Sequence, residues 1–260
     1  MKNIVIVALA VALVVNIVAG GYLYYRLNGK INGVQSQVTF LRPQRLTSQN
    51  GTPQLNSIQP QATTMTMGDL ISAIQPVIVR VDVNGQGFQS SRSGIIIRTS
   101  GVIITNGHVV NNATSIIVTL NNNQQYSAAI KADDANIDLA VIQLDNGPHD
   151  LPAATLGTLR DVFVGETVTA AGFPLGTALP GPASFTRGIM SATRTIAGQT
   201  YIQSDFQINP GNSGGALVTN NGKVIGITTS EVLSQGVDAE GIGLAIPIDV
   251  ILTYIQNNVK

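Results

Sequence analysis

The sequence has 260 residues, of which 44% are hydrophobic and 11% are charged, and its formal net charge is +0. This composition excludes a disordered chain, and without a basic excess to neutralise phosphates we expect no nucleic-acid partner. There are no cysteines, which excludes disulfides, a thiolate nucleophile and cysteine metal ligands. Because the 2 histidines lie far apart and no H-E-x-x-H motif is present, we expect no metal and no cofactor.

An almost continuous apolar run extends from Ile4 to Tyr25. About 20 apolar residues suffice to span a bilayer as a helix, and the tyrosines at the end of this run suit a membrane interface. The alternative is a cleaved secretory signal, with Val18-Ala19-Gly20 as its cleavage site. Because the run is longer than the usual apolar part of a signal, we favour a transmembrane anchor over a signal for residues 1–25.

Residues 26–68 are rich in Gln, Asn, Ser and Thr and contain no acidic residue. Such a segment buries little apolar surface, so it is expected to be a polar linker. Arg26 and Lys30 closely follow the apolar run, and by the positive-inside rule they argue against export of the rest of the chain. Long domains can cross the membrane regardless of such charges, so residues 69–260 can still lie on the external side.

The remainder of the chain shows short β-branched runs separated by Gly, Asn and Asp, which is typical of an all-β protein. A brief helix is expected over Asp69 to Ile74, before Pro76. The first set of expected strands comprises Val77 to Val83, Gly94 to Arg98, Val102 to Thr105, Ile116 to Leu120 and Leu139 to Leu144. This set predicts a first small barrel within residues 69–157.

A second set of short strands predicts another barrel within residues 158–260. Its members are Thr167 to Ala171, Gly188 to Ala192, Tyr201 to Ser204, Ala216 to Thr219, Val224 to Thr228 and Gly243 to Ile246. After Pro247 an amphipathic helix is expected from Ile248 to Asn257, with Ile248, Ile251, Leu252 and Ile255 on one face.

The stretch from Asp205 to Gly215 presents Ser213 in a glycine-rich turn. A serine hydroxyl needs a nearby base to act as a nucleophile. The segment Gly211 to Gly215 also matches the G-x-S-x-G elbow of α/β-hydrolases, but no histidine follows Ser213, and that fold requires one. The order available is therefore histidine, acid, serine.

Of the two histidines, His108 ends an apolar run, whereas His149 lies in a turn-like segment typical of solvated side chains. The acids available between base and nucleophile are Asp133, Asp134, Asp138, Asp145, Asp150 and Asp161. Only Asp138 directly precedes an apolar strand-like run, which would hold its carboxylate rigidly. We select His108, Asp138 and Ser213, although a strand-entry aspartate is the ordinary interpretation of Asp138 taken alone.

Taken together, these segments resemble the HtrA/Deg family of chymotrypsin-fold serine proteases over residues 69–260. The segments that carry the resemblance are Ile103 to Val110, Asp138 to Ile142, Gly172 to Gly176, Asp205 to Gly215 and Gly241 to Pro247. The resemblance implies a chymotrypsin-like double β-barrel with the catalytic residues in the cleft between barrels. It also implies an oxyanion hole formed by the N–H groups of Gly211 and Ser213.

The resemblance further implies a protease outside the cytoplasm that acts on unfolded or damaged proteins, and it suggests a homotrimer. Because the chain stops soon after the second barrel, the PDZ domain of many family members is not expected. The alternative is a catalytically silent, chaperone-like peptide-binding module on the same fold.

The resemblance implies a specificity pocket walled by the segment before the nucleophile, by the strand after it and by a nearby loop, here near Gln207 to Pro210, Ile225 to Thr229 and Gly241 to Ala245. Here the expected lining is Gln207, Ile208, Asn209, Ile227 and Leu244. Since these residues carry no charge, we expect cleavage after apolar side chains. Asp205 matches a general motif of the family and is not assigned to the pocket.

Overall fold

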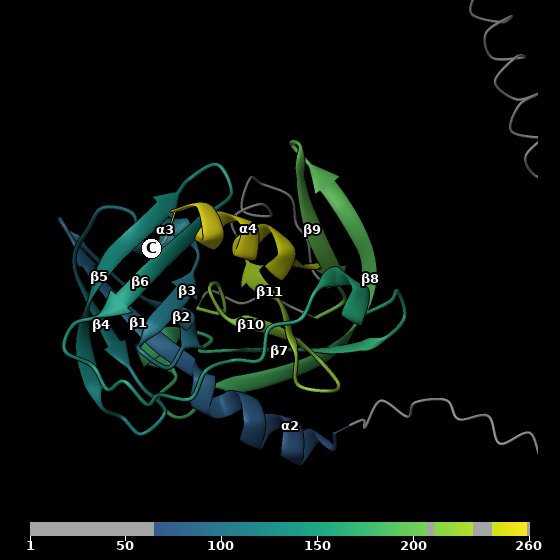
Figure 1. Cartoon of the computed structure of the whole chain (residues 1–260), viewed down its shortest axis with the longest axis horizontal. Coiled ribbons are helices and arrows are strands. Elements are labelled where there is room, and N and C mark those ends of the chain that lie inside the picture. Colours follow the sequence, from purple (N-terminus) through teal and green to yellow (C-terminus); the bar gives the residue numbers. More distant parts are fainter. Residues whose placement is uncertain (1–64, 207–210, 231–240, 259–260) are drawn as a thin grey trace, which may run out of the picture. The chain divides into compact units, whose positions relative to one another are not determined.

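The computed structural model describes residues 65–206, 211–230 and 241–258, all within one compact unit that holds both barrels (Figure 1). The expected anchor or signal (1–25) and nearly all of the expected linker (26–68) lie outside the described residues. Among the helices described, none is long and apolar enough to cross a membrane.

The described chain begins with helix α2 (Met67–Ile74), which continues into the 3-10 helix η1 (Gln75–Val77). The Thr66 hydroxyl accepts a hydrogen bond from the Asp69 N–H, so Thr66 is the N-cap of α2. The helix therefore begins two residues before the expected Asp69. Its apolar face buries Leu70 and Ile74.

The first barrel is closed in the strand order β1-β2-β3-β6-β5-β4, and every pairing is antiparallel. Closure leaves no unpaired edge. The short helix α3 (Gly107–Val110) follows β3. The strands are β1 (Ile78–Gly85), β2 (Phe88–Arg98), β3 (Val102–Thr105), β4 (Ala113–Thr119), β5 (Gln125–Asp134) and β6 (Leu139–Leu144).

The second barrel is closed in the order β10-β11-β12-β9-β8-β7, again with antiparallel pairs. The 3-10 helices η2 (Leu159–Asp161) and η3 (Gly176–Ala178) lie before β7 and before β8. The strands are β7 (Thr167–Gly172), β8 (Ser184–Ile196), β9 (Gln199–Ser204), β10 (Ala216–Thr219), β11 (Val224–Thr229) and β12 (Gly243–Pro247).

Helix α4 (Ile248–Asn258) follows β12 directly and packs against β11 and β12 (Figure 1). Its buried residues are Ile248, Ile251 and Ile255, whereas Leu252 is only partly buried. Pro247 ends the preceding strand and does not belong to the helix. The prediction of an all-β double barrel with a C-terminal helix is confirmed.

Three apolar clusters stabilise this arrangement. One fills the first barrel around Val81, Ile103 and Ile142, and another fills the second around Ile202 and Ile225. The third joins outward-facing side chains of both barrels with helices α2 and α4. Because this third cluster is shared, the two barrels are fixed against each other, and residues from both can form a single site.

Candidate active site

His108 and Asp138 meet at one end of the first barrel. His108 lies on α3, and its Nδ1 is 2.9 Å from Asp138 Oδ1 and 3.1 Å from Oδ2. The His108 backbone N–H also donates to Oδ1, at 3.0 Å. An ionised carboxylate only accepts hydrogen bonds, so the neutral imidazole carries its proton on Nδ1. Its Nε2 then has a free lone pair and can act as a base.

Asp138 has a backbone conformation that few residues tolerate. Its φ of 52° lies in the left-handed region, where aspartate is among the few side chains found. Asn106 Nδ2 donates to its carbonyl oxygen at 3.1 Å. From the second barrel, the Thr229 hydroxyl donates to Asp138 Oδ2 at 2.9 Å. Both barrels therefore fix the Asp138 carboxylate that orients His108.

The turn that carries Ser213 needs glycine at two positions with positive φ. At Gly211 (φ 103°) a Cβ would clash with the Phe173 carbonyl oxygen and lie 2.7 Å from the Leu175 nitrogen. At Gly214 (φ 84°) it would clash with the carbonyl oxygen of Ser93. The turn therefore packs its backbone directly against both barrels, as the glycine spacing predicts.

The N–H groups expected to form the oxyanion hole belong to Gly211 and Ser213. Neither donates a hydrogen bond to any described residue. The neighbouring amides are engaged, since Gly214 N donates to Thr228 O at 3.0 Å and Gly215 N to Asn212 O at 2.9 Å.

Ser93, in β2 of the first barrel, is fully buried and forms hydrogen bonds with this turn. Its backbone N–H donates to the carbonyl oxygen of Ser213 at 3.0 Å. Its hydroxyl donates to Gly211 O at 2.8 Å and accepts from Phe173 N at 2.8 Å. The sequence analysis missed Ser93, because nothing in its local pattern distinguishes it from other strand serines.

The Ser213 hydroxyl itself is directed at Ser230. The two Oγ atoms are 2.8 Å apart, and the Ser230 N–H donates to Ser213 Oγ at 3.3 Å. Within the described parts of the chain, Ser213 Oγ makes no hydrogen bond to His108. Ser213 is 0% exposed. The structure thus brings His108, Asp138 and Ser213 to one region of the molecule, with the Ser213 hydroxyl hydrogen-bonded to another serine.

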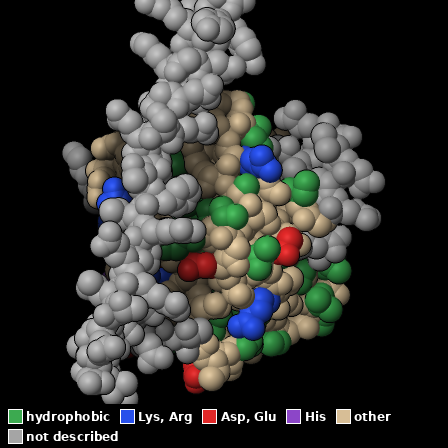
Figure 2. Space-filling view, turned by 90° about the vertical axis from the view of Figure 1, so that its right-hand side faces the viewer, with side chains coloured by type: hydrophobic (Ala, Val, Ile, Leu, Met, Phe, Trp, Pro, Cys, Tyr) green, Lys and Arg blue, Asp and Glu red, His purple; other side chains and the backbone are tan. Residues whose placement is uncertain are grey.

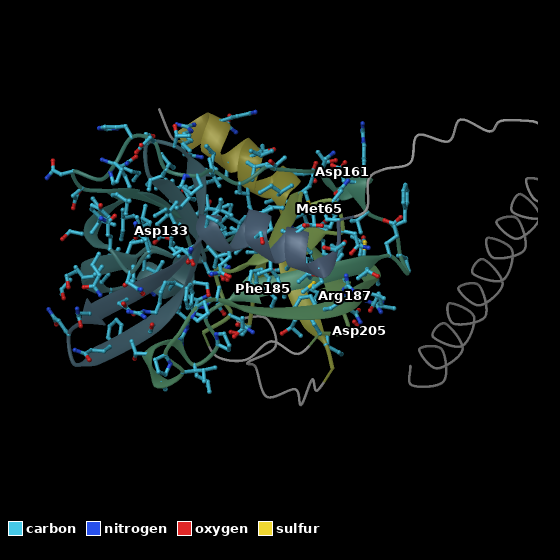
Figure 3. The ribbon with its side chains drawn as sticks, turned by 90° about the horizontal axis from the view of Figure 1, so that it is seen from below. Met65, Asp133, Asp161, Phe185, Arg187 and Asp205 are labelled. Atoms are coloured by element: carbon cyan, nitrogen blue, oxygen red, sulfur yellow. The ribbon has the colours of Figure 1, made fainter. Side chains whose placement is uncertain are left out.

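Of the other candidates, Asp133 lies near Asp138, whereas His149 and Asp161 lie in other parts of the fold. His149 is exposed in the loop after β6. Asp133 lies on the first barrel beside His108's helix, where burial, followed by the nearby Asp134 and Asp138 charges, raises its pKa (Figure 3). Asp161 lies on the second barrel and pairs with Lys223, at 2.6 Å. No group of three or more histidine and acidic side chains in the described ranges could hold a metal ion.

The expected pocket residues are only partly described. Gln207, Ile208 and Asn209 lie outside the described residues. Ile227 and Leu244 are 0% and 2% exposed and belong to the apolar cluster between the barrels. Side chains alternate along a strand, so their neighbours Thr228 and Ala245 face the other way. Neither neighbour was selected from the sequence as a pocket residue.

The carboxylate of Asp205, just before the turn, accepts a hydrogen bond from the backbone of β8. The Ile189 N–H donates to its Oδ1 at 2.7 Å, and a Cβ on Gly188 would clash with the same oxygen. Figure 3 places Asp205 beside Arg187 on the second barrel. On the face shown in Figure 2, charged side chains are dispersed among apolar and uncharged ones. The Asp205 carboxylate is therefore already engaged by the backbone of its own barrel.

Comparison with known proteins agrees with this geometry. A family model described as a trypsin-like peptidase domain matches residues 92–227, more than half of the chain. A putative serine protease HhoA from Synechocystis is 40% identical over 175 residues, or 64% of this chain and 41% of that protein. The serine protease Do-like HtrA of Lactobacillus helveticus is 38% identical over 182 residues, or 66% of this chain and 43% of that protein.

The chain belongs to the HtrA/Deg family of trypsin-like serine proteases. Among solved structures, the HtrA-type protease AlgW with a tripeptide matches with a TM-score of 0.66 and 35% identity, over 75% of this chain and 64% of that one. The serine endoprotease from Yersinia pestis matches with a TM-score of 0.64 and 32% identity, over 75% and 67%. This HtrA/Deg chain spans only about two fifths of the curated relatives' length.

Proposed function

We propose that this protein is a serine endopeptidase that hydrolyses peptide bonds of unfolded or damaged proteins. The observation that carries the proposal is the 2.9 Å contact between His108 Nδ1 and Asp138 Oδ1, which leaves Nε2 as a base. Both side chains are partly exposed, at 22% and 13%, so a base held in this tautomer would be accessible to a reacting group. The names of the relatives, which include several serine proteases, support the same reaction class.

In the proposed mechanism, Ser213 Oγ attacks the scissile carbonyl carbon while His108 Nε2 takes the hydroxyl proton. Asp138 stabilises the resulting imidazolium through Nδ1–H. The carbonyl oxygen becomes an oxyanion, which the N–H groups of Gly211 and Ser213 would bind. His108 then gives its proton to the leaving amine, and a water molecule repeats the sequence on the acyl-enzyme to release the acid and restore Ser213.

The rival proposal is a catalytically silent peptide-binding module. The observation that favours it is the Ser213 hydroxyl, which is buried and contacts Ser230 rather than His108. The two proposals differ in one measurable property, because only an active enzyme reacts covalently at Ser213.

The test is to incubate the full-length protein with unfolded casein and, separately, with a fluorophosphonate probe. An active enzyme degrades casein and is labelled at Ser213. Ser213→Ala should abolish labelling and reduce turnover by several orders of magnitude, as in serine proteases generally. Adding His108→Ala to it should cost little more, because such residues act as a unit. Casein binding without cleavage or labelling would favour the silent module.

We also propose that the protease acts outside the cytoplasm, attached to a membrane by residues 1–25. The proposal is supported by the apolar run from Ile4 to Tyr25 and by curated relatives from Pseudomonas putida named as periplasmic endoproteases. If the attachment is a retained helix, the protein should stay in the membrane fraction after carbonate washing. An N-terminus just after Gly20 would instead identify a cleaved signal. The proposed homotrimer predicts three times the chain mass in light scattering.

A further inference from the structure

Ser230 is placed to control the nucleophile. It directly follows β11, and it contacts Ser213 Oγ through both its own hydroxyl, at 2.8 Å, and its N–H, at 3.3 Å. We propose that Ser230 holds the Ser213 hydroxyl away from His108 in the resting enzyme and so lowers its reactivity until substrate binds. This inference rests on the proposed role of Ser213 as the nucleophile.

The proposal follows from the hydrogen-bonding capacity of a hydroxyl group, which has one proton and two lone pairs. The Ser230 N–H already occupies one lone pair of Ser213 Oγ. The Ser230 hydroxyl then takes either the Ser213 proton or the second lone pair. In the first case the proton is not available to His108. In the second case the oxygen is still held towards Ser230 and away from the imidazole.

Release requires only a rotation about the Ser213 Cα–Cβ bond, between staggered positions. Hydrogen bonds are exchanged, and no covalent bond changes. After the rotation, Ser213 Oγ–H can donate to His108 Nε2. The energy of the Ser230 contact therefore adds to the barrier that the free enzyme must overcome before acylation.

Ser230 has no evident structural task that would explain its hydroxyl. Its side chain is partly exposed, and among the described residues its only hydrogen-bond partner is Ser213. The preceding residue, Thr229, donates to Asp138. Two consecutive residues at the end of β11 thus contact the proposed acid and the proposed nucleophile. Thr229 donates a hydrogen bond to the proposed acid, Asp138, whereas Ser230 competes with the proposed base, His108, for the Ser213 hydroxyl.

The test is the rate of fluorophosphonate labelling of Ser230→Ala and wild-type full-length protein. Loss of one hydrogen bond between neutral groups should speed labelling about twofold to tenfold. For casein, kcat/KM should rise by a similar factor through a lower KM, with kcat little changed, because substrate binding already releases the contact in the wild type. Misfolding cannot imitate this result, since a misfolded protease loses activity.

Two further variants serve as controls. Ser230→Thr keeps the hydroxyl and should react at the wild-type rate. Ser115→Ala, on β4, removes a serine that accepts a hydrogen bond from Asn84 far from the turn, and it should also leave the rate unchanged. The pH at which labelling is half-maximal should be the same in Ser230→Ala and wild type, because Ser230 does not contact His108.

The outcomes separate this inference from the proposed function. If wild type is labelled at Ser213 but Ser230→Ala reacts equally fast or more slowly, the protein is a protease and the role of Ser230 is disproved. If Ser230→Ala is labelled and wild type is not, both proposals are supported. If neither is labelled, the proposed function fails and this inference fails with it.

Discussion

The hydroxyl of Ser93, in the first barrel, donates a 2.8 Å hydrogen bond to the carbonyl oxygen of Gly211, in the second. Gly211 belongs to the turn that presents the proposed nucleophile and contributes a proposed oxyanion-hole N–H. Because the same hydroxyl accepts from Phe173 N, one buried side chain aligns two backbone segments of the second barrel. The orientation of the Gly211 peptide thus depends on the first barrel.

We expect Ser93→Ala to lower kcat about tenfold or more while KM changes little. The variant leaves the carbonyl of Gly211 and the N–H of Phe173 buried without their partner, which costs about 1–3 kcal/mol for a buried polar group. The free energy of unfolding should fall by a similar amount, as measured by denaturant titration. Ser127→Ala, an exposed serine on β5, is the matched control and should change neither quantity. A loss of stability with kcat intact would show that Ser93 is purely structural.

Thr229 gives a second test of how the barrels cooperate. Thr229→Val keeps the shape of the side chain but removes the 2.9 Å hydrogen bond to Asp138 Oδ2. A hydrogen bond to a charged group contributes about 1.5–3 kcal/mol, so kcat should fall by roughly tenfold to a hundredfold. KM for casein should stay close to the wild-type value. Thr229→Ser retains the hydroxyl and should keep most of the wild-type activity. If Thr229→Ser were inactive, the role of the Thr229 hydroxyl in orienting Asp138 would be contradicted.

Buried strands were predicted from the sequence more accurately than exposed strands. The ranges of β3 and β6 agree with the expectation, because both are continuous apolar runs buried on both faces. Strand β5 was not predicted at all. Its residues are exposed or only partly buried, so it lacks the apolar side that marks a strand in a sequence. It forms because β4 and β6 provide pairing partners on each side.

The candidate site shows the same limit. His108 and Asp138 stood out because each adjoins an apolar strand that fixes its position. Ser93 and Ser230 did not, since their importance arises only where the two barrels and the turn meet. The structure places Ile227 and Leu244 in the apolar cluster that joins the barrels, and the other expected pocket residues lie outside the described residues. A shift of one residue in a strand reverses the face that a side chain occupies, so the side of a strand that lines a pocket is known only once its pairing is known.

The ion pair between Asp161 and Lys223 predicts a pH-dependent stability. The Lys223 ammonium, at 2.6 Å, is the main cause that lowers the pKa of Asp161 from its ordinary value of 3.8. A carboxylate whose pKa is depressed in the folded state stabilises the fold above its unfolded pKa. That contribution is lost as the pH falls through the folded pKa.

Asp161→Asn should therefore lower Tm at pH 7, and its difference from wild type should vanish in strongly acidic buffer. The amide oxygen of the substituted side chain can still accept the hydrogen bond from the N–H of Thr158, the N-cap residue of η2. The substitution therefore removes mainly the negative charge. The pair is largely solvated, so the effect should stay below about 1 kcal/mol and shrink in high salt. Asp150→Asn, at an exposed loop carboxylate, is the control. A Tm difference that persists unchanged at low pH would contradict the electrostatic origin.

Cleavage preference is predicted from the described residues around the turn, among which no acidic side chain is available to a substrate. No charged residue lies on β11 or β12, the strands expected to wall the specificity pocket. The nearby Asp205 carboxylate is engaged by Ile189 N at 2.7 Å. Burying a lysine or arginine there would leave its charge unpaired, which costs several kcal/mol, whereas burying an aliphatic side chain gains about 1.5–3 kcal/mol. The Phe206 ring packs against Gly243, where it leaves no room for a Cβ.

We therefore expect cuts in casein mainly after Val, Ile, Leu and Ala, identified by mass spectrometry of the fragments. The Ser213→Ala protein, digested in parallel, removes cuts made by contaminating proteases. Asp205→Asn provides the decisive comparison, because it removes the carboxylate that precedes the turn in the sequence while its amide oxygen can still accept from Ile189 N. The residue preference of this variant should equal that of wild type. A majority of wild-type cuts after Lys or Arg that disappears in Asp205→Asn would show instead that Asp205 turns into the pocket to bind basic side chains.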